Sequence, residues 1–346
     1  MKIGIKIGIL LLLLRFTAFD IKAQDIHFSQ FYAAEPMLTP TGVMQDADYF
    51  IGINYKNQWG WASSISNYTY RTLALSGGSK VSLDLIPAGD QLWLGGYILR
   101  DVAGDGSLTF NRLNLNIAYS RSLDRFNRFR LTAGFGSAVV QRSIDTDKFT
   151  FDNQWDNDPG IFDTNIPSGE TFDSERYIYP DLSASLRFSY ESENQNAFEL
   201  GAALRHINRP GDSFLRSENK IGLRLNNYLH ALYNINEDIK LYPSLYFATQ
   251  KKASEWVGGM NAGFKVAQGS QFEGELLTGL WYRVSDALIP AVGYVWEEWQ
   301  AILSYDINVS GLSSYSNYRG GIELSLYYRG FVQRESDIIR IPCPRL

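Results

Sequence analysis

The sequence has few of the residues that usually supply covalent stability or catalysis. Cysteine occurs once in 346 residues, and histidine occurs three times. Because one thiol cannot form a bridge within the chain, a small secreted scaffold held by disulfides is excluded. Lysine and arginine number 32 against 37 acids, which gives a net charge of −5. The basic residues are scattered among acids, so binding to nucleic-acid phosphates is not expected.

The few histidines and the paired acids do not form a recognisable catalytic motif. His27, His206 and His230 occur in no G-x-S-x-G or related context, so a serine hydrolase is not expected. Glu297 and Glu298 are adjacent and would point to opposite faces of a strand, so they are better explained by a tight turn. The sequence therefore predicts neither an enzyme nor a cofactor site.

Long hydrophobic runs are also missing, apart from a short one in the leader. Residues 1–23 have a basic start at Lys2 and Lys6, an apolar run from Ile7 to Leu14, and a small residue before Gln24. This pattern predicts a cleaved signal peptide. A retained anchor is the alternative, but the run is far shorter than the ~20 residues of a membrane helix. Export would lead to the periplasm, the medium or the outer membrane.

What the sequence does contain is alternation with a period of two. In Arg112 to Tyr119, apolar Leu113, Leu115 and Ile117 alternate with polar residues, and "DLSASLRFSY" and "GGIELSLYY" repeat the pattern. Such segments run for about 9 to 14 residues, longer than the usual ~5 or 6 of soluble strands. A soluble sandwich would also alternate, but the length favours tilted strands that cross a membrane.

The alternating segments number about 14, an even number as bacterial barrels require. With the N-terminus in the periplasm, most inner connections are short, whereas the insert 142–178 would be a long external loop. The connection from Gly77 to Gln91 is longer than this rule expects. The predicted strands lie near 49–59, 67–76, 92–101, 107–120, 128–141, 179–190, 197–207, 218–234, 238–250, 255–267, 270–284, 287–297, 299–307 and 318–331.

Aromatic residues make up 14% of the chain, which is high. Amphipathic rings are favoured where a surface meets both hydrocarbon and water, and several tryptophans fall near the ends of predicted strands. They therefore predict aromatic girdles at the two membrane interfaces, with packing in a core as the alternative for any single ring. The tryptophans in question are Trp59, Trp61, Trp93, Trp256, Trp281, Trp296 and Trp299.

Two local features outside the strands were weighed as chemical sites. The insert is rich in aspartate, and Asp152, Asp156 and Asp158 are weak candidates for calcium, although EF-hand spacing is absent and a solvated loop is the better reading. Cys343 lies between two prolines in "RIPCPRL", where regular structure is not expected. A reactive thiol is possible in principle there, but an inert one is the default.

Five stretches in order resemble the PorP/SprF family of type IX secretion and gliding-associated outer-membrane proteins of Bacteroidetes. They are "DIHFSQFYAAEPMLTPTG", "NYKNQW", "RHINRP", "GLWYRVSDALIPAVGY" and the terminal "CPRL". The resemblance covers nearly the whole mature chain. The chain departs from the family where it has "LTPTGVM" in place of the usual "LNPAYAG".

The resemblance implies an outer-membrane β-barrel without enzymatic activity, which docks a secreted surface adhesin or periplasmic ring and lipoprotein components. The main alternative is a porin or transporter that passes a small solute through a lumen lined by Arg112, Arg187, Arg224, Glu273 and Arg283. The partner-binding candidates are Phe28, Ser29, Gln30, Phe31, Tyr32, Pro36, Asn57, Trp59, His206, Pro210, Trp281, Arg283, Cys343 and Arg345.

The expected organisation is therefore an all-β transmembrane barrel with accessory segments at both ends. Residues 24–48 would form a lumenal plug or a periplasmic clasp, 49–331 the antiparallel barrel, and 332–346 a periplasmic tail. The opening stretch Gln24 to Pro40 mixes Phe28, Phe31 and Tyr32 with polar residues and does not alternate like a strand. Aromatic rings packed on the barrel wall and polar groups bonded to the lumen would explain that mixture.

Overall fold

The structure is a computed structural model, and it describes most of the chain after the leader. The described residues are 25–42, 47–60, 70–104, 106–156, 158, 160–163, 165–169, 175–212, 214, 219–266, 274–311 and 313–332. The predicted signal peptide, Trp61, Glu273, Cys343, Arg345 and nearly all of the predicted tail 332–346 lie outside the described residues.

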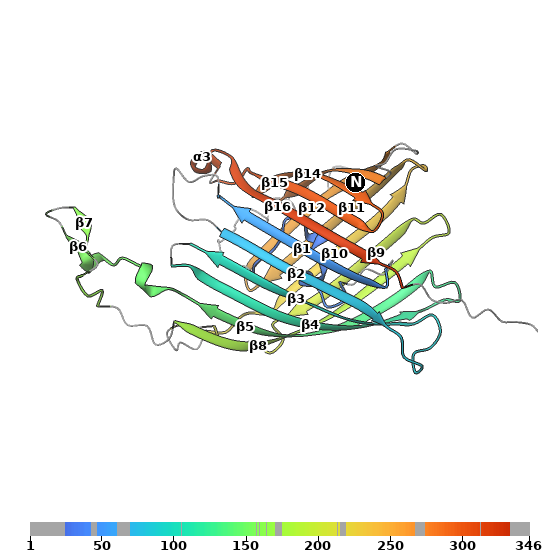
Figure 1. Ribbon diagram of the computed structural model, residues 1–346, viewed down its shortest axis with the longest axis horizontal. Helices are drawn as coiled ribbons and strands as arrows, with labels where there is room; N and C mark the ends of the chain where they lie inside the picture. The colour runs from blue at the N-terminus through green and yellow to red at the C-terminus, as the bar shows by residue number, and fades with distance from the viewer. Residues whose placement is uncertain are drawn as a thin grey trace, which may run out of the picture.

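Fourteen antiparallel strands close into one barrel, as the alternation predicts. Each strand pairs with its neighbours in sequence, and β1 pairs with β16 to close the ring (Figure 1). The barrel strands are β1 (Tyr49–Gln58), β2 (Tyr70–Val81), β3 (Gln91–Ala103), β4 (Leu108–Ser122), β5 (Phe129–Ser143), β8 (Arg176–Glu191), β9 (Ala197–Arg205), β10 (Arg224–Asn234), β11 (Ile239–Gln250), β12 (Ala253–Val266), β13 (Gly274–Arg283), β14 (Ala287–Trp296), β15 (Trp299–Asn308) and β16 (Arg319–Gly330).

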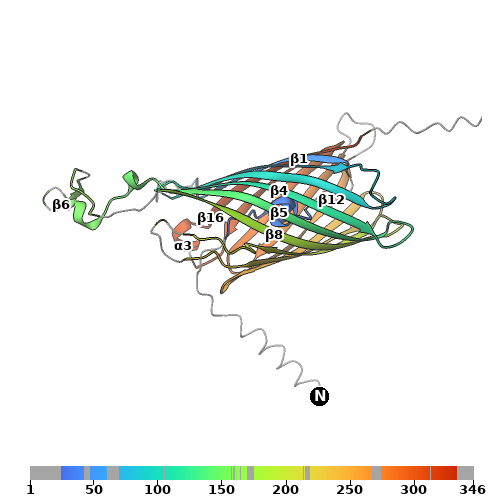
Figure 2. The ribbon, with the colours of Figure 1, turned by 90° about the horizontal axis from the view of Figure 1, so that it is seen from below.

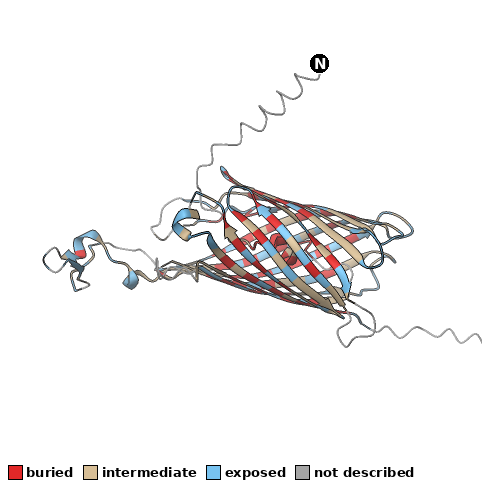
Figure 3. Ribbon diagram, turned by 90° about the horizontal axis from the view of Figure 1, so that it is seen from above, coloured by how far each residue is buried: buried red, intermediate tan, exposed pale blue. Residues whose placement is uncertain are grey.

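The two faces of the barrel wall differ as the sequence predicts. On β4, Leu113, Leu115 and Ile117 are exposed on the outside, whereas Arg112 and Asn114 are buried in the lumen. The same alternation of buried and exposed bands runs along the strands in Figure 3. An outer surface of large apolar side chains suits hydrocarbon, and a polar interior is typical of bacterial membrane barrels.

The connections at the two ends of the barrel differ in length. At the turn end, β4 and β5 are joined by 123–128, β10 and β11 by 235–238, and β14 and β15 by Glu297 and Glu298. Glu297 has a φ of 50°, so the paired acids form a tight hairpin turn, as predicted. The opposite end, called the loop end, carries 144–175 and 206–223.

The connection 144–175 projects well beyond the loop end of the barrel (Figure 2). It contains two short helical turns, η2 (Thr146–Lys148) and η3 (Asp152–Gln154), followed by a two-stranded hairpin of β6 (Trp155–Asp156) and β7 (Ile161–Phe162). A further short helix, α3 (Ser313–Ser316), lies between β15 and β16 at the same end. No helix in the described part of the chain is long and apolar enough to cross a membrane.

Two sequence predictions about the barrel need correction. The strand predicted at 67–76 continues as far as Val81, so the long inner connection from Gly77 is shortened to residues 82–90. Gly77 and Gly78 resemble a turn, yet they pair with Gly96 and Gly95 across β2 and β3. A side chain at Gly78 would meet the ring of Phe50, which lies only 2.8 Å from its ideal Cβ position. Gly78 therefore makes room for that ring inside the barrel.

The second correction concerns the predicted aromatic girdles. Trp93 and Trp281 are fully buried and point into the lumen, so neither belongs to a girdle. Trp299, by contrast, is partly exposed and packs edge-on against Tyr328. The buried and the exposed tryptophans project from opposite faces of the barrel wall. A position near the end of a strand does not reveal which face a ring projects from.

The segment before β1 lies inside the barrel. It contains a 3-10 turn, η1 (Phe31–Ala33), followed by a one-turn helix, α2 (Glu35–Leu38), whose first turn holds Pro36, where a proline is tolerated. Its buried coil is visible between the strands in Figure 3. Asp25 lies near the loop end, beside Gln250, and Asp48 reaches the turn end, where its backbone bonds to Gly330. Residues 25–42 are called the lumenal segment below.

Candidate functional site

The lumenal segment is held first by a buried carboxylate of the barrel wall. Glu323 on β16 accepts hydrogen bonds from the backbone N–H groups of Ser29 and Gln30, both at 2.8 Å. These amides precede η1, where backbone donors lack partners within the turn. The side chain of Gln30 donates to the Ser304 hydroxyl at 2.8 Å and to the Glu323 carbonyl at 3.1 Å. Glu323 thus satisfies donors that would otherwise be buried without partners.

A network of opposite charges surrounds this contact. Asp306 lies 2.7 Å from the Arg283 guanidinium, accepts a 2.7 Å hydrogen bond from the Ser29 hydroxyl, and lies 3.6 Å from the Lys56 ammonium. Lys56 also lies 3.9 Å from Glu323. Two cations thus face two carboxylates, and all four side chains are more than nine-tenths buried. Buried charges are tolerated when they are paired and hydrogen-bonded in this way.

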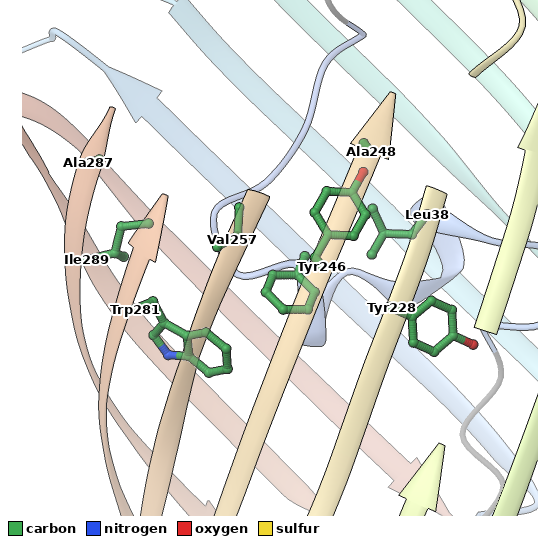
Figure 4. Close-up of a cluster of buried hydrophobic side chains, with 9 residues drawn as sticks. Leu38, Tyr228, Tyr246, Ala248, Val257, Trp281, Ala287 and Ile289 are labelled. Carbon is green, nitrogen blue, oxygen red and sulfur yellow. The ribbon is translucent and has the colours of Figure 1, made fainter. Parts of the chain in front are cut away.

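Aromatic rings hold the middle of the segment. Phe31 stacks on Tyr246 with ring centroids 5.3 Å apart, and Tyr32 stacks on Trp281 at 4.4 Å. Figure 4 shows Tyr246 beside Leu38 of the segment, with Tyr228 and Trp281 on strands to either side. Because aromatic pairs stabilise beyond their area, with about 0.5–1.5 kcal/mol for each pair, these stacks fix the position of η1.

Asparagines and a serine of the lumen wall bind the backbone around α2. The Asn226 side chain donates to the Leu38 carbonyl at 2.9 Å, and Asn116 donates to the Pro36 carbonyl at 3.4 Å. The backbone N–H of Thr41 donates to the Ser185 hydroxyl at 3.0 Å. A helix of one turn leaves most of its carbonyls without internal partners. The wall supplies those partners, so a segment with little regular structure is held in one conformation.

The loop-end part of the segment is held by a histidine between two aspartates. Nε2 of His206 lies 2.6 Å from Asp25, and Nδ1 lies 2.9 Å from Asp181. Both ring nitrogens thus face carboxylates, and both can donate at once only when the ring is the imidazolium cation. Burial lowers the pKa of His206, but the bonds to Asp181 and Asp25 outweigh it and raise the pKa above 6.5. Burial raises the pKa of Asp25, yet His206 and the nearby arginines hold it well below its ordinary value.

The anchoring of Asp25 is therefore expected to depend on pH. A raised pKa in the folded protein means that His206 stabilises the fold fully below pH 6.5, and that this stabilisation is lost as the pH rises through the folded value. His206→Gln should speed hydrogen exchange at residues 25–30 more at pH 5.5 than at pH 8.5. Exchange of the full chain in detergent, followed by mass spectrometry, measures the difference.

His27 provides the matched control, with the opposite sign. Burial lowers the pKa of His27 to about 4, despite Glu255 at 3.1 Å, so the neutral ring is favoured in the folded protein. Between pH 6.5 and pH 4 the unfolded chain therefore binds more protons than the folded protein does. The free energy of unfolding decreases as the pH falls through that interval. His27→Gln should gain stability relative to the parent as the pH falls. The same trend for both variants would contradict the assignment.

Gly42 ends the lumenal segment where no side chain fits. A Cβ at this position would lie 2.3 Å from the backbone oxygen of Glu35 and 2.7 Å from the backbone nitrogen of Pro36. Neither atom belongs to a flexible side chain, so Gly42→Ala should force α2 off the wall and cost about 1–3 kcal/mol by overpacking. Denaturant unfolding in micelles checks this. Gly311→Ala is the control, because a Cβ there meets nothing within 4 Å.

The predicted partner-binding residues fall mostly inside the barrel. Asn57 and Trp59 are partly exposed at the loop end of β1, and Pro210 is buried in the connection after β9. Tyr32 is partly exposed. The others in the described part of the chain are buried and contact one another or the lumen wall, so their binding of an external partner remains a prediction. These are Phe28, Ser29, Gln30, Phe31, Pro36, His206, Trp281 and Arg283.

The weak calcium candidates are not brought together. Within the described residues, no group of three or more acidic, histidine or cysteine side chains is gathered as a metal site would require. Asp152 begins η3, and Asp156 accepts a hydrogen bond from the backbone N–H of Asp158. The three carboxylates instead belong to a projecting loop.

Several residues of the site were not singled out from the sequence. Arg112, Arg187, Arg224 and Arg283 were expected to line the lumen, and all four do so. Their partners were missed, although polar residues on the inner face of alternating segments were the available signal. The missed residues are Lys56, Asn116, Asp181, Asn226, Asp306 and Glu323.

Comparisons with known proteins agree with this architecture. A family-wide sequence profile described as "Type IX secretion system membrane protein PorP/SprF" matches residues 21–328. No curated protein matches the sequence. The toluene transporter TbuX of Ralstonia pickettii is 9% identical, with 87% of this chain and 94% of that chain covered and a TM-score of 0.52. The Pseudomonas putida toluene transporter TodX is also 9% identical, with 90% and 99% covered and a TM-score of 0.52.

At such low identity the two transporters show the fold alone. The family match extends over the lumenal segment and almost all of the barrel, so it carries the assignment. The closed antiparallel barrel, with its apolar outer surface, gives the location in the cell envelope. The chain therefore belongs to the PorP/SprF family of type IX secretion system membrane proteins and is a β-barrel of the outer membrane.

Proposed function

We propose that this barrel works by docking proteins at its rims, either a secreted surface adhesin or ring and lipoprotein components of the secretion machinery. The lumenal segment carries the proposal. It is bonded to strands on opposite sides of the barrel, at Glu323 on β16, Asn226 on β10 and Asn116 on β4. A barrel that holds a segment of its own chain in the lumen leaves its two rims as the larger surfaces for protein partners. No catalytic role is proposed.

The projecting loop supports a docking surface at the loop end. Trp155, Ile161 and Phe162 are exposed on the β6–β7 hairpin, far from the barrel wall and its lipid contacts. Trp155 stacks edge-on against Phe162 with centroids 4.9 Å apart, so the rings form one small apolar patch. Exposed aromatic residues outside the lipid-facing band are typical of protein interfaces.

Affinity purification from native membranes tests the proposal. The tagged full chain should retain a secreted adhesin or ring components, and a Trp155→Ser/Phe162→Ser double variant should lose at least part of that set. Tyr315→Ser is the control, because Tyr315 is exposed on α3 at the same end. Retention of no secretion component by the parent chain would refute docking.

The alternative function is passage of a small solute through the polar lumen. Buried arginines at 112, 187, 224 and 283 favour it, since they would select for anions. The lumenal segment argues against it in the conformation described. A liposome conductance or swelling assay on the full chain separates the two: flux together with an absence of protein partners would replace the docking proposal with a transport one.

A further inference from the structure

A cavity of about 260 Å³ lies inside the loop end of the barrel, between the lumenal segment and the wall. One part of its lining is apolar and comes from both the segment and β3 and β4, namely Phe28, Met37, Tyr97, Leu99 and Phe110. Another part carries the cationic side chains of Arg112, Arg142, Arg205 and Lys251. The cavity thus combines an apolar wall with a cluster of cationic side chains.

Arg205 is the most unusual of these cations. Its side chain is 10% exposed, and its nearest acidic contact is Asp25 at 3.9 Å. That distance is beyond hydrogen-bond range, so the pair with Asp25 does not use the five donors that an arginine holds in a fixed plane. An acceptor in the cavity would find donors on this guanidinium.

Two neighbouring arginines also have donors to spare. Arg112 binds Asp181 at 2.6 Å and Arg142 binds Asp212 at 2.6 Å, yet the Nε–H group of each is buried without a partner among the described residues. Lys251 adds a fourth cation to the lining. The acids of the lining are Asp25, Asp101 and Asp212, and Asp181, which pairs with Arg112, adds a fourth carboxylate beside them. His206, held between Asp25 and Asp181, adds positive charge when protonated.

We propose that this cavity binds a carboxylate carried on an aromatic or aliphatic body, with the carboxylate on Arg205 and the body against Tyr97, Leu99 and Phe110. Arginine and carboxylate form bidentate pairs whose planar geometries match. A small inorganic anion fits the cavity less well, because it would lose its hydration without making apolar contacts to the rings of the wall.

The volume limits the size of the ligand. Pockets for drug-sized molecules measure roughly 300–1,000 Å³. At about 260 Å³ the cavity suits a group the size of one amino acid or a phenyl-substituted short acid. Two sources share this chemistry: a free organic acid, and the carboxyl-terminal residue of a polypeptide that enters from the loop end. The inference does not depend on the proposed docking function, since either source would occupy the cavity.

Calorimetry on the purified full chain in detergent tests the site with 3-phenylpropionate and its neutral analogue 3-phenylpropanamide. The acid should bind at least about tenfold more tightly, a difference of about 1.4 kcal/mol. Arg205→Gln should remove that preference and leave weak binding of the amide. Arg128→Gln is the control, since Arg128 pairs with Glu193 at the opposite rim. Equal binding of acid and amide to the parent chain, or binding of neither, overturns the proposal.

A second variant keeps the test decisive if Arg205→Gln does not fold. Leu108 lines the cavity and is half-buried at the start of β4, so Leu108→Trp should fill the space while every charge stays in place. This variant should abolish binding of the acid. Unchanged binding would show that the acid binds elsewhere and would overturn the proposal.

A tetrapeptide ending in phenylalanine, with a free or an amidated carboxyl group, identifies the source of the ligand. Binding of the free form alone assigns a polypeptide terminus, and exclusion of both forms assigns a free acid.

Discussion

Removal of residues 25–42 should convert an insulating barrel into an ion-conducting one. A barrel of this strand number has a lumen wide enough for a channel when nothing fills it. The deletion removes every contact described for η1 and α2, and it leaves a wall rich in arginine, asparagine and serine. Single-channel recording in planar bilayers should show steady conductance for the deletion variant and none for the full chain.

The control for this experiment is a deletion of the same kind outside the lumen. Shortening the connection 144–175 within its β6–β7 hairpin leaves the lumenal segment and its contacts intact, so the variant should insulate as the parent does. Conductance by the full chain would contradict the result at once. An insulating deletion variant that still migrates as a folded barrel would show that something other than the segment closes the lumen.

Asp306→Ala should be the most destabilising single substitution of the lumenal network. It leaves Lys56 with only Glu323 and Arg283 with only the half-exposed Asp286, and it removes the acceptor for the Ser29 hydroxyl. Removing one partner of a buried ion pair costs about 3–5 kcal/mol, because the other charge stays buried without compensation. Denaturant unfolding of the protein in micelles, followed by tryptophan fluorescence, measures the loss of free energy of unfolding.

An exposed ion pair supplies the comparison. Arg128 and Glu193 pair at the turn end, where Glu193 is largely exposed. Glu193→Ala should cost less than about 1 kcal/mol, since exposed pairs gain little from their attraction in water. Asp306→Asn, which keeps the size and some hydrogen bonding of the side chain, should fall between the two. Equal losses for Asp306→Ala and Glu193→Ala would show that the network does not hold the segment.

The barrel was predictable because its physical signal is local. A strand that separates hydrocarbon from a wet lumen must alternate along its own length, as Leu113 and Asn114 do, and that alternation can be read without knowing the partner strands. The predictions were wrong where one residue type occurs in two kinds of structure. Gly77 and Gly78 resemble a turn but continue β2, with Gly78 against the ring of Phe50, and Trp281 resembles a girdle residue but stacks on Tyr32.

The site was less predictable because its contacts join residues far apart in the chain. The mixture of aromatic and polar residues between Phe28 and Tyr32 indicated a segment that packs on a wall, and the structure places it on one. The wall residues that contact the segment are determined by strand register and tilt. Neither can be read from the sequence of a single segment. Glu323 is an ordinary inward polar residue by its pattern, and only the closed barrel brings it to the amides of Ser29 and Gln30.

The closure of the ring gives this contact a consequence for assembly. The lumenal segment leads into β1, and Ser29 and Gln30 bind Glu323 on β16, while β1 and β16 themselves form the seam, with Lys56 opposite Glu323 in their register. The segment therefore connects the first strand to the last through contacts that are separate from the hydrogen bonds of the seam. Shifting the pairing by one residue would turn Glu323 outward and leave both amides unpaired in the interior. The contacts of the lumenal segment are therefore expected to favour the correct register at the closing seam over a shifted one.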